Sequence, residues 1–321
     1  MLIFYGTENE LRKPLEAMRE VEQEMRNRNV RSAFWDMVYT GKVQNALKES
    51  SDGSGGYLVP DSFDKQIIDG LRDENVLRRI SRVVKTEHSL RIPITDETGT
   101  AQWISEEHPF VDSDVSFDQV TLDAFKLGTL IKVSEEMLED CAVNMERYLK
   151  KEFVCRIADA EEEAFLRGNG VGKPLGLVRQ AKEVPVSGSV LNFDTIIDLY
   201  YALPRLYRDN ATLLCSENAY RELRKIKTAA GHNLWTDPDE LLGCPIYTSR
   251  YLDDIAPGSM PILFGDFSYF WIGERGKTTL RRLSERYADK GQIGFQMHER
   301  VDAKLIRPEA MCCLKIKEEN A

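Results

Sequence analysis

Residues 144–172 read NMERYLKKEFVCRIADAEEEAFLRGNGVG, and this stretch decides more of the fold than any other part of the chain. Its apolar side chains recur at three- and four-residue intervals, the spacing of one helix face. They are Met145, Leu149, Phe153, Ile157, Ala160 and Ala164. Asn144 is placed as an N-cap, and Gly168 begins a glycine-rich end typical of helix C-caps. The sequence therefore predicts one helix from Asn144 to Arg167, about 36 Å long at 1.5 Å per residue.

The glycine-rich end of this helix does not match a phosphate-binding loop. The segment 168–174 has three residues between its first glycine and its Gly-Lys pair where a P-loop has four, and Pro174 replaces the hydroxyl that would bind magnesium. Leu175 also stands where a dinucleotide fingerprint has its third glycine. We interpret the segment as a turn that ends the helix.

Upstream of the helix, the segment 92–125 carries charge of one sign. It has eight acidic residues and neither lysine nor arginine. The acids are Asp96, Glu97, Glu106, Glu107, Asp112, Asp114, Asp118 and Asp123. A segment of this kind favours contact with a basic surface elsewhere.

The same segment predicts two strands joined by a long loop. Residues 91–94 and 120–124 alternate between polar and apolar side chains, and the apolar phase then slips by one residue to Phe125. We interpret this slip as a β-bulge. A projecting hairpin with Trp103 near its end would expose a large apolar surface, so we expect it to lie on another surface. The alternative is an ordinary active-site lid.

The remaining chain predicts alternating helices and strands. An apolar seam predicts a helix from Glu8 to Arg28, which needs a partner, either another copy in a coiled coil or its own chain. A short helix around Phe34 and a small-residue linker, residues 49–56, come next, and we place a domain boundary there. A helix follows from Asp61 to about Glu74. Further N-caps are predicted at Ser134, Asn192 and Ser216. Strands are predicted at 213–215, 245–248, 262–264, 269–272, 278–283, 293–297 and 312–316.

Composition narrows the functional class. The chain has 321 residues and a net charge of −10, with a pI near 5.2, which disfavours a free-standing nucleic-acid-binding domain. The sequence shows no signal peptide and no apolar run long enough for a membrane span, so we expect an intracellular, soluble chain.

The sequence offers no convincing active site. Its six cysteines form no Cys-x-x-Cys pair, and we expect them to be reduced thiols in the core. Its four histidines have no metal-ligand spacing. The carboxylates at 106–107 and 161–163 favour solvated or salt-bridged faces over acid–base dyads. We predict no catalytic, cofactor-binding or metal-binding residues and no enzyme.

Taken together, these features resemble the major capsid proteins of tailed bacteriophages, whose fold is named after Hong Kong 97 phage. The resemblance covers the chain from about Arg31 to the end. It rests on the order of Arg31-Ser-Ala-Phe-Trp35, Gly-Gly-Tyr-Leu-Val-Pro60, Gln102-Trp-Ile-Ser-Glu-Glu107, Lys132-Val-Ser-Glu-Glu-Met137, the long helix with its terminal Gly-Asn-Gly-Val-Gly-Lys-Pro-Leu-Gly176, and Arg286-Tyr-Ala-Asp289.

The resemblance implies an α+β shell subunit that assembles with itself into hexamers and pentamers of an icosahedral head. The other implied partners are a portal protein, a scaffold or head-maturation protease, and packaged double-stranded DNA without sequence-specific contact; no membrane is implied. The implied location is the virion, after assembly in the host bacterial cytoplasm. The implied parts are a scaffold-like helical segment at 1–50, an N-terminal arm at 51–85, an extended hairpin loop at 86–133, a peripheral domain at 134–190 and 276–310, and an axial domain at 191–275 and 311–321.

In that family the extended loop lies across a neighbouring subunit. The acidic hairpin would then find its basic partner on the long helix of an adjacent copy. The contact candidates are Trp103, Glu106, Glu107, Asp112 and Asp114 on the loop, and Arg147, Lys150, Lys151 and Arg156 on the helix.

Two departures from the family pattern matter. Some members join subunits by an isopeptide bond between a loop lysine and a peripheral-domain asparagine, but no lysine lies between Lys85 and Lys126 here, and no asparagine between Asn233 and Asn320. We therefore predict no such cross-links. The scaffold-like segment is also short, which leaves its cleavage open.

Two other functions remain possible on the sequence alone. The first is an encapsulin-like nanocompartment shell that encloses cargo enzymes, and the second is a soluble enzyme with an acidic lid.

Overall fold

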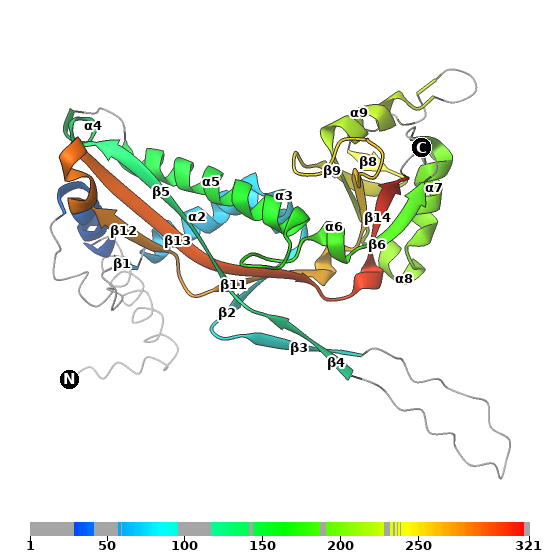
Figure 1. Cartoon of the computed structure of the whole chain (residues 1–321), viewed down its shortest axis with the longest axis horizontal. Coiled ribbons are helices and arrows are strands. Elements are labelled where there is room, and N and C mark those ends of the chain that lie inside the picture. Colours follow the sequence, from blue (N-terminus) through cyan, green and yellow to red (C-terminus); the bar gives the residue numbers. More distant parts are fainter. Residues whose placement is uncertain are drawn as a thin grey trace, which may run out of the picture. The chain divides into compact units, whose positions relative to one another are not determined.

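The computed structural model describes most of the chain beyond residue 28. The described residues are 29–41, 57–58, 60–95, 117–140, 144–186, 191–227, 232–233, 235, 237 and 239–317. The chain divides into two compact units. Unit 1 comprises Met1–Glu74, Leu127–Ile157 and Lys277–Glu299, and unit 2 comprises Asn75–Lys126, Ala158–Gly276 and Arg300–Ala321. The elements β5, α5 and β13, which are labelled in Figure 1, contribute residues to both units.

Unit 1 combines antiparallel strands with helices. Its elements are a helix at 29–40, β1 (Tyr57–Leu58), α2 (Asp61–Glu74), β5 (Phe125–Ser134), α4 (Glu135–Asp140), the first part of α5 (Met145–Arg167), β12 (Thr279–Leu283), a 3-10 helix (Glu285–Lys290) and the first part of β13 (Gln292–Leu305). Strand β12 pairs with β1 and β13, and β5 also pairs with β13.

The core of unit 1 is closed by aromatic side chains and one close helix approach. Phe34 and Trp35 of the helix at 29–40 are buried, with ring centroids 6.2 and 5.1 Å from that of Phe63 on α2. A Cβ added at Gly70 of α2 would lie 3.0 Å from a methyl carbon of Val154 on α5. The missing side chain therefore lets these two helices pack closely.

Helix α5 confirms the prediction from its sequence. Asn144 caps it, since its Oδ1 accepts from the backbone N–H of Arg147 at 3.1 Å. The helix ends at Arg167, and the glycine turn follows. A Cβ at Gly168 would lie 2.0 Å from the carbonyl oxygen of Pro174, so only glycine fits there.

Unit 2 contains a mixed sheet, a two-stranded ribbon and part of a second sheet. Its elements are α3 (Val76–Ile80), β2 (Arg82–Thr86), β3 (Leu90–Thr95), β4 (Phe117–Leu122), α6 (Leu177–Gln180), β6 (Lys182–Val186), α7 (Phe193–Ala202), α8 (Arg205–Arg208), β7 (Thr212–Cys215), α9 (Glu217–Lys225), β8 (Glu240–Leu241), β9 (Cys244–Thr248), β10 (Ile262–Gly265), a 3-10 helix (Phe267–Tyr269), β11 (Phe270–Arg275), a 3-10 helix (Pro308–Ala310) and β14 (Met311–Ile316).

The mixed sheet has the order β6-β14-β10-β7-β9-β8. Helices α7 and α9 supply residues to its apolar core, among them Ile196, Leu199 and Leu223. The predicted caps are in place: Asn192 Oδ1 accepts from Thr195 N at 2.8 Å, and Ser216 Oγ accepts from Ala219 N at 3.2 Å.

The predicted hairpin is present as an antiparallel ribbon. Strands β3 and β4 pair from Leu90 with Leu122 to Thr95 with Phe117. The predicted β-bulge is wrong, because residues 123–124 separate two strands with different partners: β4 pairs with β3, and β5 pairs with β13. The slip in apolar phase marks this change of partner.

Candidate functional site

The predicted contact residues on the hairpin fall outside the described residues. These are Trp103, Glu106, Glu107, Asp112 and Asp114. The four basic candidates are all on α5 in unit 1 and lie within the described residues.

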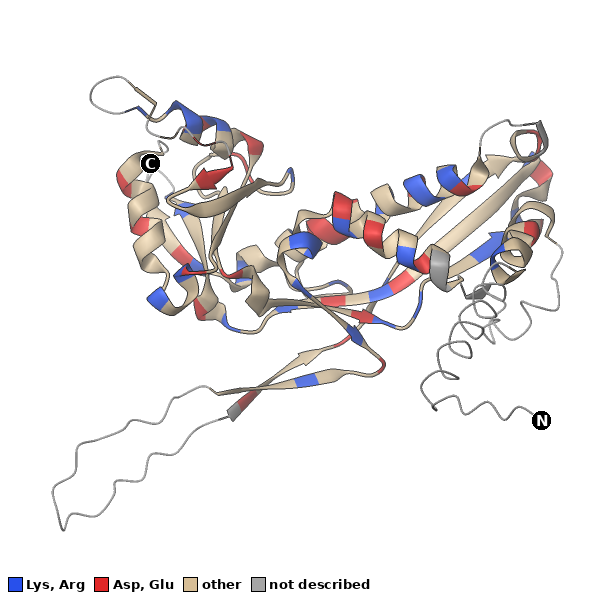
Figure 2. Cartoon of the chain, turned by 180° about the vertical axis from the view of Figure 1, so that it is seen from behind, with Lys and Arg blue, Asp and Glu red and all other residues tan. Residues whose placement is uncertain are grey.

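Three of those four share one exposed face of α5. Lys150 and Lys151 follow Arg147 by three and four residues, about one helical turn, and each of the three is exposed or half-buried. No hydrogen bond or ion pair to another described residue is found for their side chains. Figure 2 shows the basic residues along this helix. The face therefore presents positive charge that the described chain does not neutralise.

Arg156 differs from the other three. It lies nine residues after Arg147, which places it on the opposite side of a helix with 3.6 residues per turn. Its guanidinium binds Glu152 at 2.9 Å and donates to the carbonyl oxygen of Leu130 on β5 at 3.2 Å. The structure therefore brings three of the predicted basic residues together and engages the fourth elsewhere.

A buried ionic cluster in unit 2 was not predicted from the sequence. Arg78 on α3 donates through Nε and Nη2 to Glu161 on α5, both at 2.6 Å, and also contacts Glu274 on β11. The Arg78 side chain is 1% exposed and that of Glu161 is 0% exposed. The expectation of a salt-bridged carboxylate thus holds for Glu161, although the pair is buried.

The next residue, Glu162, corrects the same expectation. It is buried, and it accepts a hydrogen bond from Ser249 Oγ at 2.5 Å. Burial raises the pKa of the Glu162 carboxyl, although the bonds from Ser249 and from the Val76 backbone lower it. It is neither solvated nor in an ion pair found among the described residues.

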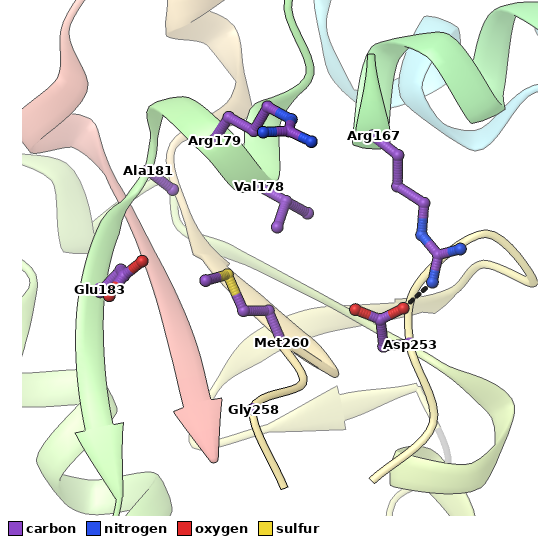
Figure 3. A pocket seen from close by; sticks show the side chains of 8 residues that line it. All are labelled: Arg167, Val178, Arg179, Ala181, Glu183, Asp253, Gly258 and Met260. Carbon is purple, nitrogen blue, oxygen red and sulfur yellow. Dashed lines mark ion pairs between the residues drawn. The ribbon is translucent and has the colours of Figure 1, made fainter. Parts of the chain in front are cut away.

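The pocket in Figure 3, of about 520 Å³, also belongs to unit 2. It is lined by Arg167, Val178, Arg179, Ala181, Glu183, Asp253, Gly258 and Met260. Arg167 pairs with Asp253 across it, and Glu183 pairs with Lys315 at 2.7 Å. These residues include no serine, cysteine or histidine, so the pocket supplies no side-chain nucleophile of those types.

The buried cysteine thiols among the described residues are poor nucleophiles as well. Burial raises the pKa of Cys215 to about 12 and that of Cys313 to about 12, which keeps both thiols protonated near neutral pH. Cys244 and Cys312 are also buried, whereas Cys155 is only half-buried, so the expected core position is wrong for that residue. Among the described residues, no cluster suited to a metal ion and no helix that could cross a membrane occurs.

Comparison with known proteins decides the family. The model of the phage capsid family matches residues 55–316. The chain belongs to the phage capsid family. In this capsid-family chain, α5 and both six-stranded sheets lie inside the match.

Two relatives with similar sequences are both named major capsid proteins. The chain is 24% identical over 270 residues to the major capsid protein of Klebsiella oxytoca phage phiKO2, covering 74% of this chain and 63% of that protein. It is 24% identical over 266 residues to the major capsid protein of Escherichia phage T5, covering 75% and 58%. The chain therefore spans about three fifths of the length of these relatives.

Solved structures agree in fold. The capsid of a native GTA particle has a TM-score of 0.68 and 28% identity, covering 75% of this chain and 89% of that chain. A chain from Gordonia phage Cozz has a TM-score of 0.61 and 15% identity, covering 76% and 87%. The mixed α+β fold predicted from the sequence, that of Hong Kong 97-type capsids, is confirmed.

Proposed function

We propose that this chain is the major capsid protein of a tailed phage or prophage, and that its copies form the hexamers and pentamers of an icosahedral head enclosing double-stranded DNA. The observation that carries the proposal is the family match over 55–316, supported by the likeness to the GTA particle capsid. In such a shell, many modest interfaces add up and symmetry closes the container.

Within this proposal, the parts of the chain have separate roles. Residues 1–50 are a scaffold-like segment, 51–85 an N-terminal arm and 86–133 the extended loop. Residues 134–190 and 276–310 make the peripheral domain, and 191–275 and 311–321 make the axial domain. The protein acts mechanically and not as an enzyme, and its subunits are held without isopeptide cross-links.

The proposed partners follow from the same role. They are other copies of the chain, a portal protein, a scaffold or maturation protease, and the packaged DNA. A net charge of −10 fits a container that encloses DNA without gripping it in a sequence-specific way. Assembly takes place in the bacterial cytoplasm, and the finished location is the virion.

The contact between copies that we propose joins opposite charges. The segment 92–125 contributes eight negative charges and no positive ones. The exposed face of α5 offers Arg147, Lys150 and Lys151, which are not neutralised by the described residues. We therefore place the hairpin of one copy on this face of its neighbour, and we leave out Arg156, whose guanidinium is already engaged.

Electron microscopy and size-exclusion chromatography of the full chain test the shell itself. Closed particles tens of nanometres across are expected. A monomer or small oligomer under all assembly conditions would contradict the proposal, and particles that copurify with a cargo enzyme would favour a nanocompartment instead.

Charge reversal tests the proposed contact. Lys150→Glu with Lys151→Glu should reduce assembly, because an exposed charge pair contributes about 0.2–1 kcal/mol and reversal replaces attraction by repulsion. The expected weakening is about 1–2 kcal/mol per subunit, roughly tenfold at each interface, and smaller at high salt.

A rescue and a control sharpen this test. Adding Glu106→Lys and Glu107→Lys to the reversed chain should restore assembly. The matched control reverses Lys65 and Lys290, two exposed lysines of the same unit outside the α5 face. Normal assembly of the Lys150 and Lys151 variant at both low and high salt would refute the contact.

A further inference from the structure

Side chains from one strand end hold the backbone of the β3–β4 hairpin. Lys304, near the end of β13, donates through Nζ to the carbonyl oxygen of Thr121 at 2.6 Å. Arg307, just beyond that strand, donates through Nη1 to the carbonyl oxygen of Thr95 at 2.7 Å. The two acceptors are on opposite strands of the ribbon, so both strands are held.

Asp302 makes the third contact from the same strand. Its Oδ2 accepts from the backbone N–H of Asp123 at 2.8 Å, and its Oδ1 accepts from the N–H of Ala303 at 2.8 Å. The residue is 0% exposed. A buried carboxylate is stable only when its oxygens are used in this way. We call Asp302, Lys304 and Arg307 the root clamp.

A second set of contacts ties the two sides of the hairpin root together. Ser89 precedes β3 and donates through Oγ to the Asp123 carboxylate, just after β4, at 2.8 Å. Arg275, the last residue of β11, reaches the same Asp123 carboxylate at 4.0 Å. The chain entering the hairpin and the chain leaving it are therefore joined where they meet the body of unit 2.

Apolar burial contributes little to the direction of the ribbon. Of the residues of β3 and β4 whose burial the structure describes, 90–95 and 118–122, Leu122 alone is buried; the others are half-buried or exposed. A ribbon with so little packing would swing freely if it were held by packing alone. The polar contacts to its backbone are the remaining constraint.

We propose that Asp302, Lys304 and Arg307 are positioning residues that set the direction in which the hairpin leaves its own subunit. The inference rests on the proposed function, because direction matters when the hairpin must reach a neighbouring copy. The clamp holds two carbonyl oxygens and one N–H, so it leaves the side chains of the hairpin available to that neighbour. Since both strands are held, displacing either one breaks a bond.

Hydrogen exchange of unassembled, full-length subunits tests the clamp directly. In Lys304→Met with Arg307→Met, amide exchange in residues 90–95 and 117–122 should rise about tenfold or more, since two bonds from charged donors are lost. Exchange in β14 should keep its wild-type rate. Lys304→Arg with Arg307→Lys retains both donors and should restore protection.

Arg300 provides the matched control. It is an exposed arginine of β13, and no contact between its side chain and the hairpin is found among the described residues. Arg300→Met removes the same charge from the same strand and should leave the exchange unchanged. Unchanged exchange in the Lys304 and Arg307 double variant, or an equal rise in Arg300→Met, would overturn the clamp.

Assembly yield then separates the clamp from the proposed function. The double methionine variant should assemble less well than wild type, with recovery in the Arg and Lys exchange variant. Faster exchange with undiminished assembly would overturn the positioning role. If the wild-type chain forms no shell at all, the proposed function fails, while the exchange data still decide whether the clamp holds the hairpin.

Discussion

Replacing Arg78 by methionine would leave a buried carboxylate without its counter-charge. Two bonds of 2.6 Å join Arg78 to Glu161, and both side chains are almost wholly excluded from water. Methionine fills much of the arginine stem's volume but donates no hydrogen bond. Glu161 would then have to stay charged and unpaired, bind a proton, or move toward water.

The size of the effect follows from this burial. Removing one partner of a buried pair costs about 3–5 kcal/mol, far more than the same change on the surface. At about 2–4 °C per kcal/mol for a domain of this size, the melting temperature should fall by roughly 10 °C. Thermal and urea unfolding of the full-length, unassembled chain measure both quantities.

A double-mutant cycle separates the ion pair from general damage to the fold. Glu161→Gln added to Arg78→Met removes the charge of the more deeply buried of the two carboxylates that Arg78 contacts, so the double variant should recover about 2 kcal/mol relative to additivity. The neighbouring Arg79 is exposed and stacks on Tyr247 at 4.8 Å, and Arg79→Met should cost about 1 kcal/mol or less. An Arg78→Met chain within about 1 kcal/mol of wild type, or an additive cycle, would refute the reasoning.

Two further predictions concern acidity and backbone strain. Burial raises the pKa of Glu162 above its ordinary value of 4.5, so the folded chain binds this proton more tightly than the unfolded chain does. The stability that this proton contributes is fully present below pH 4.5 and is lost as the pH rises through the pKa of the folded chain. The Glu162→Gln side chain cannot ionise, so this variant should be more stable than wild type near neutral pH, and the difference in unfolding free energy should shrink toward acid. Urea unfolding across the pH range measures this difference. A difference that stays constant with pH would contradict the prediction. Gly168→Ala should destabilise the fold by about 3 kcal/mol or more, because the new Cβ would lie 2.0 Å from the Pro174 carbonyl oxygen. Gly172→Ala should cost about 1 kcal/mol, because its Cβ would have no neighbour within 4 Å and the only penalty is the φ of +69°. Equal losses in the two alanine variants, measured by the same unfolding assay, would show that the clash is not what matters.

The elements that the sequence predicted well depend on local chemistry. The long helix starts at an asparagine cap and ends at glycines, and both signals lie within a few residues of the boundary they set. The caps at Asn192 and Ser216 are of the same kind. The hairpin strands could be recognised because alternation is also a short-range pattern.

The features that the sequence missed depend on distant partners. Arg78 meets Glu161 across 83 residues and Glu274 across 196, and no local pattern reports such a pair. Arg156 was grouped with the other basic residues by charge alone, whereas its phase on the helix directs it to Glu152 and Leu130. The phase slip at Phe125 predicts a bulge, but a change of strand partner produces the same slip in the sequence.

The root clamp has a consequence for how the hairpin can change in evolution. Every amino acid has a carbonyl oxygen, so replacing Thr95 or Thr121 leaves the acceptors of Lys304 and Arg307 in place. Asp123 is more restricted, because its N–H is used and proline has none. The hairpin can therefore acquire new side chains to suit a changed neighbour, while its direction is inherited from the few residues at the end of β13.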